Sequence, residues 1–186
     1  MAIYVTSDLH GNHEKYIQIF DKINFTDDDT LFVLGDIVDR GTGSMKILLD
    51  MMSRFNVIPI LGNHELMFIK AYKEKIENSL NLWFENDGQN TFNEFLLLKS
   101  NEQEAVLNYL QRFSLYKELN INNQDYILVH SGFDKFKKRK PLKEYTVEEL
   151  VWAETDYDKV YFKDKILITG HTPVSAILFD STADKI

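Results

Sequence analysis

Five short runs of β-branched and aliphatic residues, each ending directly in polar or glycine residues, constrain the fold of this chain most strongly. Near-continuous apolar runs of this length are typical of strands that are buried on both faces. Sites in open α/β sheets form just beyond the carboxyl ends of the strands, so the polar residues that follow the runs are expected to meet. The predicted strands, each with the polar segment that follows it, are 3–6 with 7–11, 31–34 with 35–36, 57–61 with 62–65, 126–129 with 130–132 and 166–169 with 170–171.

Helical patterns separate the first three predicted strands. Apolar residues recur at helical spacing over 16–23 and again over 47–55, and Ser44 is the predicted N-cap of the second helix. This alternation of strands and helices predicts an α/β fold. Residues 66–119 are interpreted as mostly helical, with a break at 86–88 and with apolar side chains that form core or lid packing. No repeat or linker is apparent, so residues 1–186 are interpreted as one domain.

Composition excludes several classes of protein. The formal net charge of −8 disfavours tight binding to nucleic acid, which depends on Lys and Arg neutralising phosphates. The chain has no cysteine, so a phosphocysteine mechanism is excluded. It has no basic region followed by an apolar run at its start, and no apolar run long enough to span a membrane. We therefore expect a cytoplasmic protein without a nucleic-acid or membrane partner.

The residues that follow the predicted strands are of the types that bind divalent metals in proteins. Asp8 and His10 are two positions apart, so in an extended segment both side chains point the same way. A carboxylate and an imidazole that converge in this way suit a divalent cation. A lone histidine at a strand end is usually structural, but the recurrence at five strand ends predicts a metal site. The other candidate ligands are Asp36, Asn63 with His64, His130 and His171.

The motif set resembles that of the phosphoprotein phosphatase family of calcineurin-like metallophosphoesterases. It is most similar to that of the bacterial and phage-type serine/threonine phosphatases, and the resemblance covers nearly the whole chain. A further segment, Trp83–Thr91, is similar to the Trp…Asn-Gly-Gly…Thr stretch of the bacterial members. The matching motifs are Asp8–Gly11, Gly35–Gly41, Gly62–Glu65, His130–Gly132 and Gly170–Pro173.

The resemblance implies a site with two divalent metal ions. The implied ligands of the first ion are Asp8, His10 and Asp36. Asp36 then bridges to the second ion, whose further implied ligands are Asn63, His130 and His171. Arg40 is implied to hold phosphate, and His64 to be a proton donor that Asp39 orients. Manganese is the usual metal in the bacterial relatives, and iron and zinc suit the same ligands.

The resemblance also implies a fold and a reaction. The fold is a four-layer α/β/β/α sandwich with two mixed sheets. Two cations would lower the pKa of a bridging water, which supplies hydroxide for in-line attack on phosphorus. The Arg40 fork can hold two phosphoryl oxygens, and an imidazolium at His64 can protonate the leaving alkoxide. The expected substrates are phosphomonoesters, namely phosphoserine and phosphothreonine in proteins or small phosphoesters.

Two departures from the family pattern stand out. Glu154 occupies the position of a second phosphate-binding arginine, which places a repulsive carboxylate there. The family usually continues past Gly-His-Thr-Pro with further strands, so either a shorter variant or an incomplete set of C-terminal strands is expected. The basic run 135–143 is interpreted as a solvated loop, or alternatively as a docking surface for acidic substrates.

Two other functions remain open. One is hydrolysis of dinucleoside polyphosphates such as diadenosine tetraphosphate, and the other is non-enzymatic, metal-dependent binding. The symmetrical type of the first enzyme typically has Ala at the position of Asp39 and Asp at the position of Glu65. The sequence therefore favours the phosphomonoesterase, while Glu154 and the short segment after Gly-His-Thr-Pro are the features that favour the binding protein.

Overall fold

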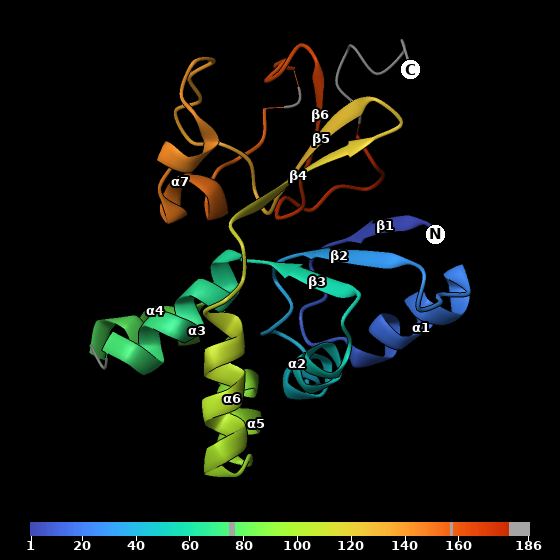
Figure 1. The fold of residues 1–186 in the computed structure, drawn as a ribbon. Coiled ribbons are helices and arrows are strands. Elements are labelled where there is room, and N and C mark those ends of the chain that lie inside the picture. Colours follow the sequence, from blue (N-terminus) through green and yellow to red (C-terminus); the bar gives the residue numbers. More distant parts are fainter. Residues whose placement is uncertain (75–76, 157, 179–186) are drawn as a thin grey trace.

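The computed structural model describes residues 1–74, 77–156 and 158–178 (Figure 1). Within these ranges no helix is both long and apolar enough to cross a membrane. The elements in chain order are β1 (Ile3–Thr6), α1 (His13–Ile23), β2 (Thr30–Leu34), α2 (Ser44–Ser53), β3 (Val57–Ile60), α3 (Asn63–Glu74), α4 (Glu77–Glu85), α5 (Gln89–Leu96), α6 (Ser100–Leu110), β4 (Tyr116–Ile121), β5 (Gln124–Val129), a 3-10 turn (Leu142–Glu144), α7 (Val147–Val151) and β6 (Lys165–Ile168).

The first sheet, called sheet A, consists of β1, β2 and β3 in that order, and its strands are all parallel. Parallel neighbours need a crossover connection, which α1 and α2 provide. Figure 1 shows both helices below this sheet. The expectation of two mixed sheets is therefore wrong for sheet A as the structure describes it, because two consecutive β-α-β units leave no antiparallel pair.

The second sheet, called sheet B, has the order β4-β5-β6, with β4 antiparallel and β6 parallel to β5. A two-residue turn at Asn122 and Asn123, both with positive φ, joins β4 to β5, and such turns match the twist of a hairpin. The prediction of helix up to residue 119 is wrong from Tyr116 onward, because this segment pairs with β5. The predicted break at 86–88 is confirmed, since α4 ends at Glu85 and α5 begins at Gln89.

Side-chain packing orders the layers. In β2, Leu31 and Val33 belong to the core that sheet A shares with the helices, whereas Phe32 and Leu34 face the other way. Phe32 and Leu34 pack with Leu128 of sheet B, so the two sheets lie face to face. This alternation follows from the two-residue period of a strand. The predicted α/β class is confirmed, with the helices, sheet A and sheet B as successive layers.

The outer face of sheet B, unlike that of sheet A, is not covered by long helices in the described residues. Ile127 and Val129 of β5 point away from sheet A and pack against Phe133, Tyr145 and Leu150. This cover consists of the short helix α7 and irregular chain between β5 and β6. The fourth layer of the expected sandwich is thus mainly non-helical over the described residues.

Helix α2 begins differently from the prediction. Its N-cap is Gly43, and Ser44 is the first helical residue. The Ser44 hydroxyl accepts from the Asp39 backbone N–H at 3.2 Å and contacts Thr91 Oγ1 at 2.9 Å. Glu94 of α5 satisfies a free N–H of this helix end, accepting from Met45 N at 2.9 Å. The polar start of α2 therefore connects to the loop after β2 rather than capping its own helix.

Glycine allows the ends of β2 and β3 to approach closely. Gly35 has φ +75°, and a Cβ there would lie 2.5 Å from Gly62 Cα and 2.8 Å from His130 Nδ1. Any larger residue would separate the loop after β2 from the loop after β3 and from sheet B. Gly35 thus fixes how closely the polar residues that follow these strands can meet.

The buried carboxylate of Glu65 holds these two loops together. Its Oε1 accepts from the backbone N–H groups of Ile37 at 2.7 Å and Val38 at 3.1 Å. Its Oε2 accepts from Asp36 N at 2.9 Å and Gly62 N at 3.1 Å. The side chain is fully buried, so each of these donors would otherwise lack a partner. Glu65 therefore shapes the loop after β2.

Glu65→Gln is expected to lower the free energy of unfolding by about 3 kcal/mol or more, because an amide keeps one acceptor oxygen and loses two charge-assisted hydrogen bonds worth about 1.5–3 kcal/mol each. Glu94→Gln is the matched control, since a glutamine oxygen can still accept the single bond from Met45 N. Urea unfolding followed by circular dichroism measures both variants. Equal, small losses would show that Glu65 does not organise the loop.

Candidate metal centre

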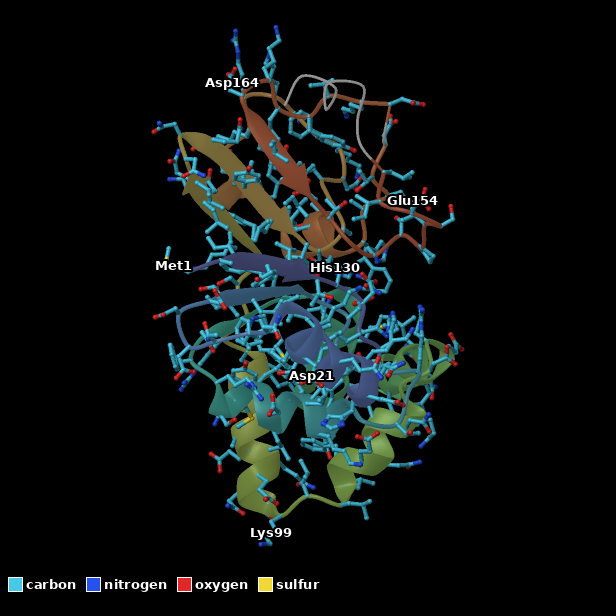
Figure 2. The ribbon with its side chains drawn as sticks, turned by 90° about the vertical axis from the view of Figure 1, so that its right-hand side faces the viewer. Met1, Asp21, Lys99, His130, Glu154 and Asp164 are labelled. Carbon is cyan, nitrogen blue, oxygen red and sulfur yellow. The ribbon has the colours of Figure 1, made fainter. Side chains whose placement is uncertain are left out.

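The polar residues that follow the strands meet where the two sheets face each other. Figure 2 shows His130 at the level where sheet A and sheet B come together. Among the described residues, two groups of three side chains have ligand atoms that all lie within 4.8 Å of one another. Asp36 belongs to both groups. The groups are His10, Asp36 and His64, and Asp36, His130 and His171.

The two carboxylate oxygens of Asp36 face different imidazoles. Asp36 Oδ1 lies 3.3 Å from His130 Nε2. Asp36 Oδ2 lies 3.7 Å from His10 Nε2 and 3.9 Å from His64 Nε2. A carboxylate placed in this way can bind one cation through each oxygen.

Backbone carbonyls orient two of these imidazoles. His130 Nδ1 lies 2.6 Å from the Leu34 carbonyl oxygen, and His10 Nδ1 lies 3.2 Å from the Val38 carbonyl oxygen. In a neutral ring Nδ1–H donates to the carbonyl, which leaves the Nε2 lone pair directed at Asp36. Metal-binding histidines are usually oriented by such a bond from the second nitrogen.

Burial keeps the rings neutral. It lowers the pKa of His10 to about 4, with a contribution from the nearby Arg40 guanidinium. Burial, together with the neighbouring His130, lowers the pKa of His171 to about 4. Burial lowers the pKa of His130 as well. Neutral imidazole is the form that binds a metal.

Burial disfavours the charged form of two carboxylates at the site. Burial raises the pKa of Asp36 to about 7, with a smaller contribution from the Asp8 carboxylate. Burial and the charge of Asp36 raise the pKa of Glu65 to about 7. Buried anions are stable when they are paired or bind a metal, so a cation at Asp36 would remove this penalty.

The Asn63 amide supplies a further oxygen. Asn63 Oδ1 lies 2.9 Å from His130 Nε2, and His171 Nδ1 lies 3.2 Å from the same nitrogen. With the opposite amide orientation, the Asn63 NH2 would donate to both rings and to both Asp36 oxygens. As placed, the Asn63 oxygen faces ring nitrogens, and a cation between these atoms would accept their lone pairs. The donor set of carboxylate, amide oxygen and imidazole thus fits a divalent metal.

Among the predicted carboxylate and imidazole ligands, Asp8 is the one that lies outside both groups of three. Its Oδ2 accepts from the neighbouring Ser7 hydroxyl and, at 3.0 Å, from the backbone N–H of His171. Asp8 still lies beside the cluster, and its bond to His171 joins sheet A to the loop after β6.

His64 has a different partner from the other imidazoles. Its Nδ1 lies 2.7 Å from Oδ2 of Asp39, a fully buried carboxylate. The Trp83 indole N–H donates to the same oxygen at 2.8 Å. Burial alone would lower the pKa of His64, but the bond to Asp39 and the charge of Asp36 raise it overall. His64 is therefore the imidazole that favours the protonated form.

Trp83 is the site residue that sequence reasoning missed. Its aromatic pattern predicted core packing, and its ring does stack on Phe68, with centroids 4.7 Å apart and planes at 8°. Its N–H, however, contacts Asp39, which is 44 residues away in sequence. The similarity of Trp83–Thr91 to the family segment was the one signal that could have identified this role.

Arg40 and Glu154 occupy exposed positions. The Arg40 backbone N–H donates to the Asp87 carbonyl at 3.1 Å, and the Asn90 amide donates to the Arg40 carbonyl at 2.9 Å. The turn after α4 and the first turn of α5 thus both support the loop that carries Arg40. Glu154 forms no hydrogen bond or ion pair with the described residues, and Figure 2 shows it at the right-hand edge. Within the basic run, Lys140 pairs with Glu149 at 2.8 Å.

Left-handed backbone conformations concentrate at this site. Non-glycine residues avoid positive φ because Cβ approaches the backbone, at a cost of about 1–3 kcal/mol per residue. Strained conformations of this kind persist only where surrounding contacts hold them. Six of the nine predicted site residues adopt positive φ: Asp8, His10, Asp36, Asp39, Arg40 and His171.

Trp83→Phe is expected to lower the free energy of unfolding by about 1–3 kcal/mol, because it removes one hydrogen bond to a buried carboxylate and retains an aromatic ring against Phe68. For a chain of this size, each kcal/mol corresponds to about 2–4 °C in Tm. Trp152→Phe is the matched control, since Trp152 is 41% exposed. Equal Tm values for the two variants would contradict the importance of the Trp83–Asp39 bond.

Comparison with curated proteins finds relatives of one kind. Two curated relatives are symmetrical bis(5'-nucleosyl)-tetraphosphatases. The one from Buchnera aphidicola is 33% identical over 151 residues, which is 80% of this chain and 50% of that protein. The one from Salmonella paratyphi C is 31% identical over 138 residues, 71% of this chain and 43% of that protein. The matched region therefore spans half or less of the length of these relatives.

A solved structure and a family model identify the fold and the family. The crystal structure of a candidate diadenosine tetraphosphatase superposes with a TM-score of 0.56 and 18% identity, covering 81% of this chain and 61% of the other. At that identity the likeness shows the fold alone. The model of the calcineurin-like phosphoesterase family matches residues 1–185. The family resemblance seen in the sequence is thereby confirmed, and the chain belongs to the calcineurin-like phosphoesterase family.

Proposed function

We propose that this metal-dependent phosphoesterase hydrolyses dinucleoside polyphosphates such as diadenosine tetraphosphate. The observation that carries the proposal is the identity of 33% with a symmetrical tetraphosphatase over 80% of the chain. The sequence alone favoured phosphomonoesters, with the dinucleotide as the alternative. Phosphomonoesters were favoured because Asp39 and Glu65 stand where the symmetrical tetraphosphatases typically have Ala and Asp. The identity with curated tetraphosphatases now favours the dinucleotide instead.

The candidate ligands divide between two metal ions. One ion would take His10, Asp36 and Asp8, and the other Asp36, Asn63, His130 and His171. His10 and His130 donate from Nδ1 to backbone carbonyls, which suits ligands. When bound, two divalent ions would neutralise phosphoryl charge and activate water. Manganese remains the expected metal, and a cytoplasmic location remains a prediction.

The remaining residues would act on the substrate directly. Arg40 lies on a supported loop beside the cluster and would hold phosphoryl oxygens with its guanidinium fork. His64 would give its Nε2 proton to the leaving oxygen, while Asp39 keeps the ring oriented and charged. Trp83 would fix Asp39 from the other side.

A second candidate has its own observation. The buried Asp39–His64 pair is a proton donor, which a strongly basic alkoxide leaving group needs most. Hydrolysis of an anhydride releases a phosphate, which needs little protonation. This pair therefore favours phosphoserine and phosphothreonine as substrates, in proteins or in peptides, as the second candidate function.

Metal content can be measured directly. The wild-type chain, loaded with manganese and freed of excess by gel filtration, is expected to carry two ions by mass spectrometry of the metal. His10→Ala and His130→Ala should each retain fewer, because each removes one neutral nitrogen from a different group of three. His13→Ala, at the start of α1, is the control and should retain two. One ion in the wild type would contradict the dinuclear proposal.

The substrate can be tested with one panel. We expect kcat/KM for diadenosine tetraphosphate to exceed that for a phosphothreonine peptide at least tenfold. His64→Asn should reduce peptide hydrolysis by about 10²–10⁴-fold and dinucleotide hydrolysis much less, because the two leaving groups differ in their need for an acid. His13→Asn is the control for losing an imidazole nearby. A faster reaction with the peptide would select the second candidate instead.

A further inference from the structure

A polar pocket lies next to the metal centre, between α1 and the end of β1. Its volume is about 600 Å³. Asp8 and His10 line one side of it, and Lys15, Gln18 and Lys22 of α1 line the other. In Figure 2, α1, marked by Asp21, lies directly below β1 on the face toward the viewer. The pocket therefore begins at proposed metal ligands and extends along a helix.

Helix α1 presents its two pocket lysines on one face. Lys15, Gln18 and Lys22 are separated by three and four residues, which places them in one stripe of a helix. Lys15 and Lys22 are seven residues apart, or about 10 Å along the helix axis. A single phosphate bound at the metal ligands cannot follow this stripe, whereas a chain of several phosphates can.

Two contacts fix the orientation of this helix. The Asn12 side chain caps its N-terminus, accepting from Lys15 N at 3.0 Å. Tyr16 is fully buried on the opposite face, and its hydroxyl donates to Asp50 of α2 at 2.7 Å. With Tyr16 held in the core, the lysine stripe stays directed at the pocket.

The pocket has charge that suits an anion. Neither Lys15 nor Lys22 forms an ion pair with any residue that the structure describes, although the chain carries a formal net charge of −8. No Phe, Tyr or Trp is among the described residues that line this pocket, so a nucleobase would find no large aromatic ring to stack on besides the His10 imidazole, a proposed metal ligand. The chemistry fits phosphates better than bases.

We propose that this pocket binds the stretch of a polyphosphate next to the phosphoryl group that reacts, with Lys15 and Lys22 as the residues that select polyphosphates over single phosphates. The inference rests on the proposed function only in placing the reacting phosphoryl group at the metal centre. The ligand class is a linear chain of three or more phosphates, either free or within a nucleotide.

The test uses the full chain loaded with manganese, with divalent ion in excess over the probe. Isothermal titration calorimetry measures the affinity for tripolyphosphate and for orthophosphate. We expect Lys15→Ala/Lys22→Ala to weaken tripolyphosphate binding about tenfold, which corresponds to about 1.4 kcal/mol. Orthophosphate binding should change less than twofold. The tripolyphosphate effect should shrink as salt is added, because ions screen exposed charges.

Lys138→Ala/Lys143→Ala is the matched control, because it removes two exposed lysines from the basic run outside the pocket. The inference is overturned if both double variants weaken tripolyphosphate binding equally, since only net charge would then matter. It is also overturned if the pocket variant weakens orthophosphate as much as tripolyphosphate, or if the wild type does not prefer tripolyphosphate. Circular dichroism melting confirms that the variants are folded.

A separate measurement tests whether the pocket binds the phosphates of a dinucleotide as well as free polyphosphate. KM for diadenosine tetraphosphate, measured with the same variants, should rise about tenfold only in the pocket variant. If tripolyphosphate binding responds as expected but the dinucleotide is not hydrolysed by the wild type, the proposed substrate fails and the polyphosphate pocket stands. If the dinucleotide is hydrolysed and neither measurement responds to the lysines, the pocket assignment fails and the proposed function stands.

Discussion

The rest of the site depends on one buried carboxylate that accepts four backbone hydrogen bonds. Glu65 lies in the first turn of α3, and three of its four donors belong to the loop after β2. The loop has to be held, because Asp36, Asp39 and Arg40 adopt left-handed conformations that L-residues avoid. Glu65 offsets this strain with charge-assisted bonds, at the cost of a buried anion beside Asp36. The geometry of the metal centre therefore has its origin in a residue that binds neither metal nor substrate.

The imidazoles of the site differ in pKa because their Nδ1 atoms have different partners. A backbone carbonyl beside Nδ1 of His10 or His130 is a neutral acceptor, so burial dominates and each ring stays unprotonated. Beside Nδ1 of His64 the acceptor is a carboxylate, which outweighs burial and favours the cation. Rings of one chemical type, packed within a few ångströms, thereby differ in the protonation state that each favours.

Features set by neighbouring residues could be predicted from the sequence, whereas features set by contacts between distant residues could not. The strands that carry the candidate ligands were predicted because an apolar run followed by Asp, Asn or His is a local pattern. Strand β4 was not, because Lys117, Glu118 and Asn120 give it a polar composition and its strand character comes from pairing with β5. The contacts of Glu65 with Ile37 and of Trp83 with Asp39 span 28 and 44 residues, which no local pattern records. Asp8 was recognised as a candidate ligand, while its bond to the His171 backbone became visible only in three dimensions.

That bond between Asp8 and His171 spans 163 residues and has a consequence for the order of folding. Contacts between such distant positions form late, because the entropy of closing the intervening chain is lost before they stabilise anything. Sheet A, with Asp36 and Asn63, can assemble from the first 65 residues, whereas His130 and His171 arrive only with sheet B. During synthesis on the ribosome, a nascent chain would therefore present four of the six proposed ligands for several seconds, at about 5–20 residues per second, before the other two emerge. Full metal affinity would then mark the moment at which the two sheets have docked.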